Sequence, residues 1–247
     1  MIEDELKKAG ISKLDAILVG HAHYDHSIDA PLISEMMECQ VWGSESYGQV
    51  HQSTVQNKER WRPVSGKKQV VTVGKFTVTF VKSDHARARN FVQRAVEGEV
   101  TEPFSVPAPY WRYKCGDVYA IHIDHPEGSI VVTTSAGSEP GQFDGMRSDI
   151  VFLGIGQVTK QDEGLGRAYW HEAVEVPGPK VVVPVHWDDF TVRLEEGQLR
   201  PFPKYADDTS ASIRWLHQMA GESGLRLRAM DLRDSLLLSS RRVLMAP

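Results

Sequence analysis

The fold is decided by the stretch Leu14-Asp15-Ala16-Ile17-Leu18-Val19-Gly20-His21-Ala22-His23-Tyr24-Asp25-His26. Residues 14–19 form an apolar run that predicts a buried strand. Four groups that can bind a metal follow within six residues: His21, His23, Asp25 and His26. Clusters of histidine and aspartate at such short spacing are what zinc chemistry requires. The stretch therefore predicts a metal site at a strand exit, where open α/β sheets generally carry their chemistry.

The spacing of these four residues indicates how they divide between metal positions. Alternate side chains of an extended segment share a face, so we expect His21, His23 and Asp25 to point the same way. We expect His26 to turn off that line where the strand gives way to a loop or helix. Two imidazoles can then hold one ion, while Asp25 and His26 reach towards a second position.

At this hexapeptide the chain resembles the metallo-β-lactamase superfamily, whose hallmark is H-x-H-x-D-H after an apolar strand. The resemblance implies an α/β fold, the αββα sandwich, with one or two metal ions, usually zinc, at one edge. It also implies several strands before the motif, whereas only 20 residues precede it here. We therefore expect the N-terminal strands to be shortened or missing: the chain is a fragment, its start is misassigned, or its first sheet is small.

Two later histidines match the remaining metal ligands of the superfamily. His85 follows the β-rich run at residues 76–81, and His186 follows the apolar run at residues 180–185. Trp187 is expected to wall the site. The resemblance assigns the first metal to His21, His23 and His85, and the second to Asp25, His26 and His186.

The strand end at residues 132–137 departs from the commonest pattern of the superfamily. Many members carry there an aspartate that bridges the two metals, whereas this chain has Thr134 or Ser135, depending on the strand alignment. A neutral hydroxyl is a poor bridging ligand, because it brings no negative charge between two dications. Some metallo-β-lactamases lack this aspartate and still hold two zincs, so the departure leaves open the metal count rather than metal binding.

Composition bounds the class of protein. The chain has 247 residues, which suffices for one domain spanning residues 1–247. Hydrophobic residues make up 41% and charged residues 25%, as in an ordinary soluble globular protein. A net charge of −5 and a pI near 6.1 argue against a general nucleic-acid binder.

The same sequence bounds partners and localisation. No apolar run approaches the roughly 20 residues of a membrane helix, so we expect no membrane span. The expected partner is a small-molecule substrate, with no nucleic acid, and a homo-oligomer is left open. Residues 1–8 lack the apolar core of a signal peptide, so the sequence as written is that of a cytoplasmic protein, but the localisation is left unknown. A signal peptide encoded upstream is left open.

The two cysteines give a weaker signal than the histidines. Cys39 and Cys115 are too few for a disulfide framework, and neither lies in a spacing typical of metal ligands. We expect both to be buried thiols rather than ligands or a bridge.

Periodicity and turn residues predict the remaining elements. Residues 86–111 are the least regular part, with three prolines, and long loops of this kind often act as lids or binding loops. Arg87 and Arg89 there favour a substrate with a carboxylate or phosphate, with solvated surface arginines as the alternative. The predicted helices lie at residues 3–10, 31–38, 44–52, 169–176 and 207–221, and the strands at 40–43, 69–73, 76–81, 113–125, 128–134, 149–154, 180–185 and 225–238.

The expected function is metal-dependent hydrolysis. A bound dication lowers the pKa of its water from about 15.7 towards about 7, which gives a hydroxide nucleophile at neutral pH. Asp25 would orient the attacking water and receive its proton. We predict a hydrolase with one or two ions, zinc or another divalent transition metal, whose metal-bound hydroxide cleaves an ester, amide, lactone or phosphodiester bond. The alternative is a degenerate member that acts as a non-enzymatic binding or structural protein.

Overall fold

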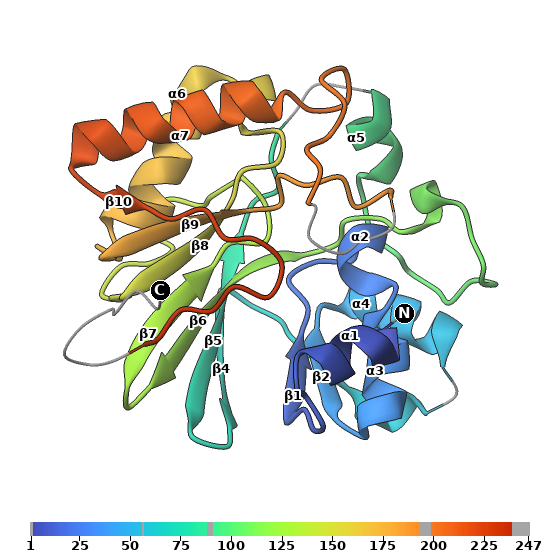
Figure 1. Cartoon of the computed structure of the whole chain (residues 1–247). Coiled ribbons are helices and arrows are strands. Elements are labelled where there is room, and N and C mark those ends of the chain that lie inside the picture. Colours follow the sequence, from blue (N-terminus) through green and yellow to red (C-terminus); the bar gives the residue numbers. More distant parts are fainter. Residues whose placement is uncertain (1, 56, 88–90, 193–198, 239–247) are drawn as a thin grey trace. The chain divides into compact units, whose positions relative to one another are not determined.

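A computed structural model describes residues 2–55, 57–87, 91–192 and 199–238 (Figure 1). The chain divides into two compact units. Unit 1 comprises Met1–Gln69 and Asn90–Val118, and unit 2 comprises Val70–Arg89 and Tyr119–Pro247. The single-domain organisation expected from the sequence stays a prediction.

Unit 1 is built on a parallel sheet with the strand order β1-β2-β3. These strands are Ala16–Leu18, Gln40–Gly43 and Trp61–Pro63. Parallel neighbours need a crossover, and helices supply it after each strand. The histidine motif, which starts at His21, follows the end of β1 and lies on the crossover from β1 to β2. The helical segments of this unit are α1 (Ile2–Lys8), α2 (Tyr24–Ser27), α3 (Ala30–Met37), α4 (Glu45–Thr54), α5 (Phe91–Val96) and the 3₁₀ turns η1 (Lys58–Arg60) and η2 (Tyr110–Arg112).

The apolar core of unit 1 reaches directly into the motif. Val19 and Ala22, on either side of His21, are buried in one cluster with Tyr47 and Val50 of α4. Burial of the Tyr47 ring raises the pKa of its hydroxyl. Because Val19, two residues before His21, and Ala22, directly after it, are fixed by close packing, the position of His21 is set by the core of unit 1.

Unit 2 is built on a seven-stranded sheet with the order β10-β9-β8-β7-β6-β5-β4. β6 and β7 form an antiparallel hairpin, and β7, β8, β9 and β10 pair in parallel. The apolar runs of β8 and β9 are mostly buried, as is typical of strands covered on both faces. The strands are β4 (Lys68–Val73), β5 (Phe76–Ser83), β6 (Val118–His125), β7 (Gly128–Val132), β8 (Ile150–Gly154), β9 (Val181–Val185) and β10 (Arg226–Leu227).

Two long helices of unit 2 pack together beside β8 and β9 (Figure 1). They are α6 (Glu163–Trp170), which continues as the π-helical turn η4 (His171–Glu175), and α7 (Thr209–Ser223); the 3₁₀ turn η3 (Val158–Lys160) precedes them. Trp170 and Leu216 are fully buried in the cluster that also holds Val151 and Val182 of the sheet. This cluster is the main core of unit 2.

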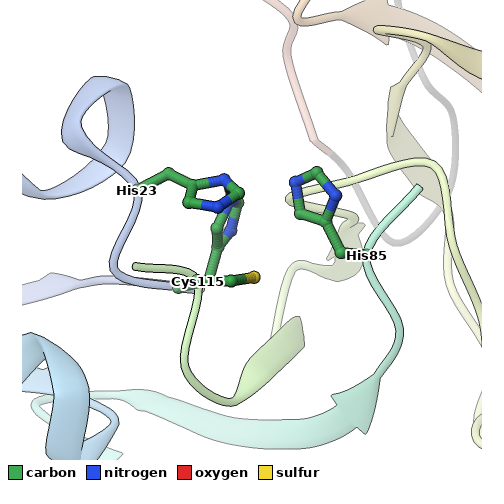
Figure 2. A group of neighbouring side chains, drawn as sticks. His23, His85 and Cys115 are labelled. Atoms are coloured by element: carbon green, nitrogen blue, oxygen red, sulfur yellow. Dashed lines mark hydrogen bonds between the residues drawn. The ribbon is translucent and has the colours of Figure 1, made fainter. Parts of the chain in front are cut away.

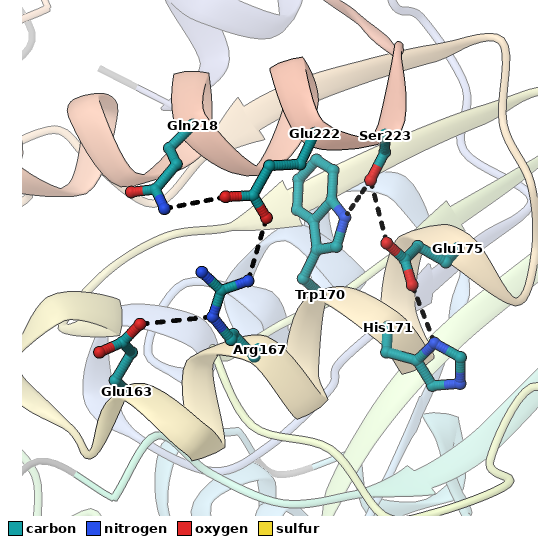
Figure 3. Close-up of polar contacts among 8 residues, drawn as sticks. All are labelled: Glu163, Arg167, Trp170, His171, Glu175, Gln218, Glu222 and Ser223. Carbon is teal, nitrogen blue, oxygen red and sulfur yellow. Dashed lines mark hydrogen bonds and ion pairs between the residues drawn. The ribbon is translucent and has the colours of Figure 1, made fainter.

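A polar network joins the π-helical end of α6 to α7 (Figure 3). The indole Nε1 of Trp170 donates to Ser223 Oγ at 3.0 Å, and Ser223 Oγ donates to Glu175 at 3.0 Å. His171 Nδ1 lies 2.9 Å from the other Glu175 oxygen. The serine bonds the carboxylate and not the imidazole, so this is not the order of a Ser-His-acid triad. The network is a structural link between helices.

Three predicted segments differ from the structure. The helix expected at residues 169–176 begins at Glu163, with Asp162 as its N-cap. The closing strand expected at residues 225–238 is limited to Arg226–Leu227, and the irregular stretch 86–111 contains α5. Among the residues described, no helix combines the length and apolar character that crossing a bilayer requires.

Candidate metal centre

The motif of unit 1 forms a tight loop between β1 and α2. The Ser27 hydroxyl on α2 donates to the carbonyl of Ala22 at 3.0 Å, which ties the helix back to the loop. The extended alternation ends at His23, because α2 begins at the next residue. Asp25 therefore lies on a helical turn and not on the extended segment expected from the sequence, whereas His26 turns off into a helix as expected.

His21 and His23 turn ring nitrogens towards each other. His21 is 0% exposed and His23 7% exposed, and His21 Nε2 lies 3.2 Å from His23 Nδ1. The other nitrogen of His23, Nε2, donates to the carbonyl of Val96 at 3.3 Å, which leaves a lone pair on Nδ1. A zinc ion roughly 2.0–2.1 Å from both nitrogens would subtend about 103° at this separation, near the tetrahedral angle. The pair fits one shared cation.

Asp25 and His26 form a second group next to this pair. Asp25 Oδ2 lies 3.2 Å from His26 Nε2, and both side chains are mostly buried. The ring centroids of His21 and His26 are 4.1 Å apart. All four motif residues that the sequence indicated are thus brought together within unit 1.

Cys115 lies in the same cluster. From the sequence we expect it to be a buried thiol rather than a metal ligand. Its sulfur and the ligand nitrogens of His21 and His23 all lie within 4.8 Å of one another. The thiol is 8% exposed, and its side chain lies near that of His23 (Figure 2). A lone cysteine before a β-strand carries no spacing signal, so the sequence alone could not single it out.

His85 belongs to unit 2 and follows the end of β5 (Figure 2). Its Nδ1 donates to the carbonyl of Ala86 at 3.1 Å, so Nε2 is the unprotonated nitrogen of this ring. The Ser83 hydroxyl donates to the carbonyl of Gly137 at 3.0 Å. A Cβ at Gly137 would collide with the backbone carbonyls of Asp84 and His85. Glycine therefore allows the close approach that holds this strand end.

Thr134 and Ser135, the expected bridging position, follow β7 in unit 2. Thr134 Oγ1 donates to the carbonyl of Tyr119 at 3.0 Å. Ser135 Oγ accepts a hydrogen bond from the backbone N–H of Ala86 at 3.0 Å. Both hydroxyls thus bond backbone groups, and Ser135 helps to fix the segment that carries His85.

His186 follows β9 in unit 2 and has a left-handed backbone with φ of 60°. Such a conformation is uncommon outside glycine and is found most often where function or packing imposes it. Its ring lies 5.5 Å from that of Phe190, edge to face. The parallel partner of the preceding Val185 is Gly154, so His186 stands at the carboxyl edge of the β8–β9 pair.

Two other buried histidines have different roles. His51 Nδ1 lies 3.4 Å from the Tyr47 hydroxyl and its Nε2 3.2 Å from the Asn57 carbonyl, and burial lowers the pKa of this imidazole. The His122 Nε2 donates to the carbonyl of Arg147 at 2.8 Å. Both rings bond within their own units and are not grouped with candidate ligands.

The arginines after β5 and a separate cavity of unit 2 bear on substrate binding. Arg87 is exposed and pairs with Asp84 at 2.6 Å, so a carboxylate already balances its charge. Arg89 lies outside the described residues. Unit 2 also contains a cavity of about 540 Å³ whose lining includes Trp187, Arg200 and Asp231. Trp187 directly follows His186, so one residue of the cavity lining is the sequence neighbour of a candidate ligand.

The donor set narrows the choice of metal. Unit 1 holds imidazoles, one carboxylate and one thiol, and unit 2 holds the imidazoles of His85 and His186. Imidazole and thiolate suit zinc, iron and other transition metals, whereas magnesium and calcium take oxygen ligands. The residues present fit a transition metal.

A family model described as "Beta-lactamase superfamily domain" matches residues 3–187 of the chain. Comparison with curated proteins gives no match. Solved structures of related fold share little sequence identity with it. The metallo-beta-lactamase fold protein YhfI from Bacillus subtilis is 16% identical with a TM-score of 0.52, covering 92% of this chain and 79% of that chain.

Two further structures show the range of this fold. Igni18, a metallo hydrolase from Ignicoccus hospitalis, is 16% identical with a TM-score of 0.51, covering 94% of this chain and 81% of that chain. CmlA, a diiron beta-hydroxylase from Streptomyces venezuelae, is 11% identical with a TM-score of 0.53, covering 89% of this chain and 44% of that chain. The expected α/β fold class is confirmed, and the chain belongs to the metallo-β-lactamase superfamily.

Proposed function

We propose that this protein is a metal-dependent hydrolase of small-molecule ester, amide, lactone or phosphodiester bonds. The observation that carries the proposal is the pair of buried nitrogens, His21 Nε2 and His23 Nδ1, 3.2 Å apart. Two buried imidazoles whose nitrogens lie at this separation can share one cation, as imidazole ligands of zinc do.

The ligand assignment follows the motif order of the superfamily. His21, His23 and His85 form the first set, and Asp25, His26 and His186 form the second. The outer hydrogen bonds of His23 to Val96 and of His85 to Ala86 support it, because metal-binding imidazoles usually donate their other N–H to such partners. The chemistry that the bound metal supplies is an activated water at neutral pH and stabilisation of negative charge on the substrate oxygen.

The side chains of the motif have distinct tasks in this mechanism. Asp25 orients the attacking water and accepts its proton, and proximity of the carboxylate to that water makes the transfer effective. The buried loop around His21 and His23 excludes bulk water, which strengthens electrostatic interactions with the developing charge. The cavity lined in part by Trp187 offers room for a small molecule.

The proposal is tested by elemental analysis and turnover on the same preparations. We expect about one to two zinc or similar ions per chain and hydrolysis of at least one compound in a panel of lactones, phosphodiesters and β-lactams. Iron is measured as well, since the fold of CmlA houses a diiron centre. His21→Ala and His23→Ala should lose metal, while His217→Ala, an exposed histidine of α7, should retain it.

The outcomes separate the two candidate functions. Metal without turnover across the panel would favour the binding or structural protein over the hydrolase. Unchanged metal content in both motif variants would refute the site assignment itself, because the control variant shows how much a neutral histidine loss changes the measurement.

A further inference from the structure

Cys115 is held beside the motif by its own backbone. Its N–H donates to the carbonyl of Val96 at 2.9 Å, and its carbonyl accepts from the N–H of Ala22 at 3.0 Å. Ala22 is the residue between His21 and His23. The Val96 carbonyl also accepts the Nε2–H of His23, so it bonds both the histidine and the cysteine. These bonds lock the cysteine against the histidine pair within unit 1.

The thiol also lies close to both imidazoles. Its sulfur and the nitrogens of His21 and His23 lie within 4.8 Å of one another, and all three side chains are buried. A zinc ion holds a sulfur and a nitrogen about 3.6 Å apart at the tetrahedral angle, given bonds of about 2.3 and 2.05 Å. A side-chain movement of about 1 Å therefore suffices to bring the thiol to bonding distance.

We propose that Cys115 binds the first metal as a thiolate, together with His21 and His23. The proposal rests on the metal site of the proposed function. On binding, the thiol loses its proton to solvent and a sulfur–metal bond forms, with no change in oxidation state. The thiolate brings a negative charge to the first metal position. The hydroxyls of Thr134 and Ser135, at the expected bridging position, provide none.

This ligand changes the charge and the ligand count of the first metal position. His21, His23 and Cys115 would give it three ligands from unit 1, two imidazoles and one anionic thiolate. Thiolate also favours zinc or cobalt over manganese or magnesium at the first position.

Cobalt(II) substitution of the full chain tests the proposal directly. Wild-type protein and Cys39→Ser should show a thiolate-to-cobalt charge-transfer band, and Cys115→Ser should lack it. Cys39 is the matched control, because it is the other buried thiol, 4% exposed, and burial raises the pKa of its thiol. Competition with a chelator should show at least about tenfold weaker binding of the tighter ion in Cys115→Ser, since losing even an outer partner of a ligand costs about that much.

The results distinguish the failure of this inference from that of the proposed function. Cobalt bound by the wild type without a thiolate band overturns the role of Cys115 and leaves the hydrolase proposal intact. A band that persists in Cys115→Ser has the same consequence. A wild-type chain that binds no cobalt overturns both. If Cys115→Ser does not fold by circular dichroism, the Cys39→Ser spectrum decides, because Cys115 is then the one thiol left: a thiolate band supports the proposal and its absence overturns it.

Discussion

Gly156 in unit 2 offers a sharp test of the assignment of His186 as a metal ligand. A Cβ at this position would lie 2.5 Å from His186 Nδ1, 3.1 Å from its Cε1 and 2.9 Å from its backbone oxygen. Ordinary contacts between such atoms are about 3.5–4.0 Å, so in Gly156→Ala the imidazole must retreat by about 1 Å. The φ of Gly156 lies outside the left-handed region, so alanine adds crowding without backbone strain.

The magnitude follows from that displacement. Overpacking of a fitted site costs about 1–3 kcal/mol of folding free energy. Misplacing a catalytic group by about 1 Å can lower turnover by about 100-fold. We therefore expect Gly156→Ala to lose metal from the second position, to fall in kcat by about 100-fold, and to melt at a lower temperature than the wild type.

Gly221→Ala is the matched control. Gly221 lies in α7, where an added Cβ meets nothing within 4 Å. Alanine in a helix interior is favoured over glycine by about 0.5–1 kcal/mol, so this variant should melt at an equal or higher temperature. Elemental analysis after dialysis, turnover and thermal unfolding are measured on all three proteins. Metal content unchanged in Gly156→Ala despite a lower melting temperature would refute the ligand role of His186.

Two further predictions concern unit 2. Gly137→Ala puts a Cβ against the backbone carbonyl of His85, which cannot swing away, so chelator competition should show at least about tenfold weaker metal binding; unchanged affinity would contradict the role of His85. The hydrogen bond from His171 holds the pKa of Glu175 below its ordinary value of 4.5, so its stabilising effect is full above that value and is lost as the pH falls below it. Glu175→Gln should therefore be less stable than the wild type at about pH 6, by about 1 kcal/mol or less, and the gap should close near pH 3 in urea unfolding; a gap independent of pH would contradict this.

The local part of the site could be predicted from the sequence, because it depends on adjacent residues. His21 and His23 face each other through the geometry of one short loop, and alternation over three residues suffices to foresee it. The place of Asp25 could not be foreseen so well, because the helical turn starts at Tyr24 and ends the alternation. Cys115 could not be foreseen at all, because its place depends on backbone hydrogen bonds between segments far apart in the chain.

The fold shows the same division between local and tertiary causes. The strands β2 and β8 match predictions closely, since apolar β-rich runs determine them. The early start of α6 was missed because Gly164 and Gly166 lower helix propensity in its first turns. The structure compensates with the Asp162 cap, which accepts from the N–H of Gly164 at 2.9 Å.

The charges of the two proposed donor sets explain how the chain could dispense with a bridging aspartate. A shared acid holds two dications close together, but Thr134 and Ser135 are neutral and bond the backbone of unit 2. In its place each proposed set has one anionic ligand of its own, the thiolate of Cys115 for the first and the carboxylate of Asp25 for the second. Two ions that are neutralised separately need no common ligand. The position that elsewhere supplies charge is then free to serve packing, and Ser135 uses it to fix the strand end from which His85 projects.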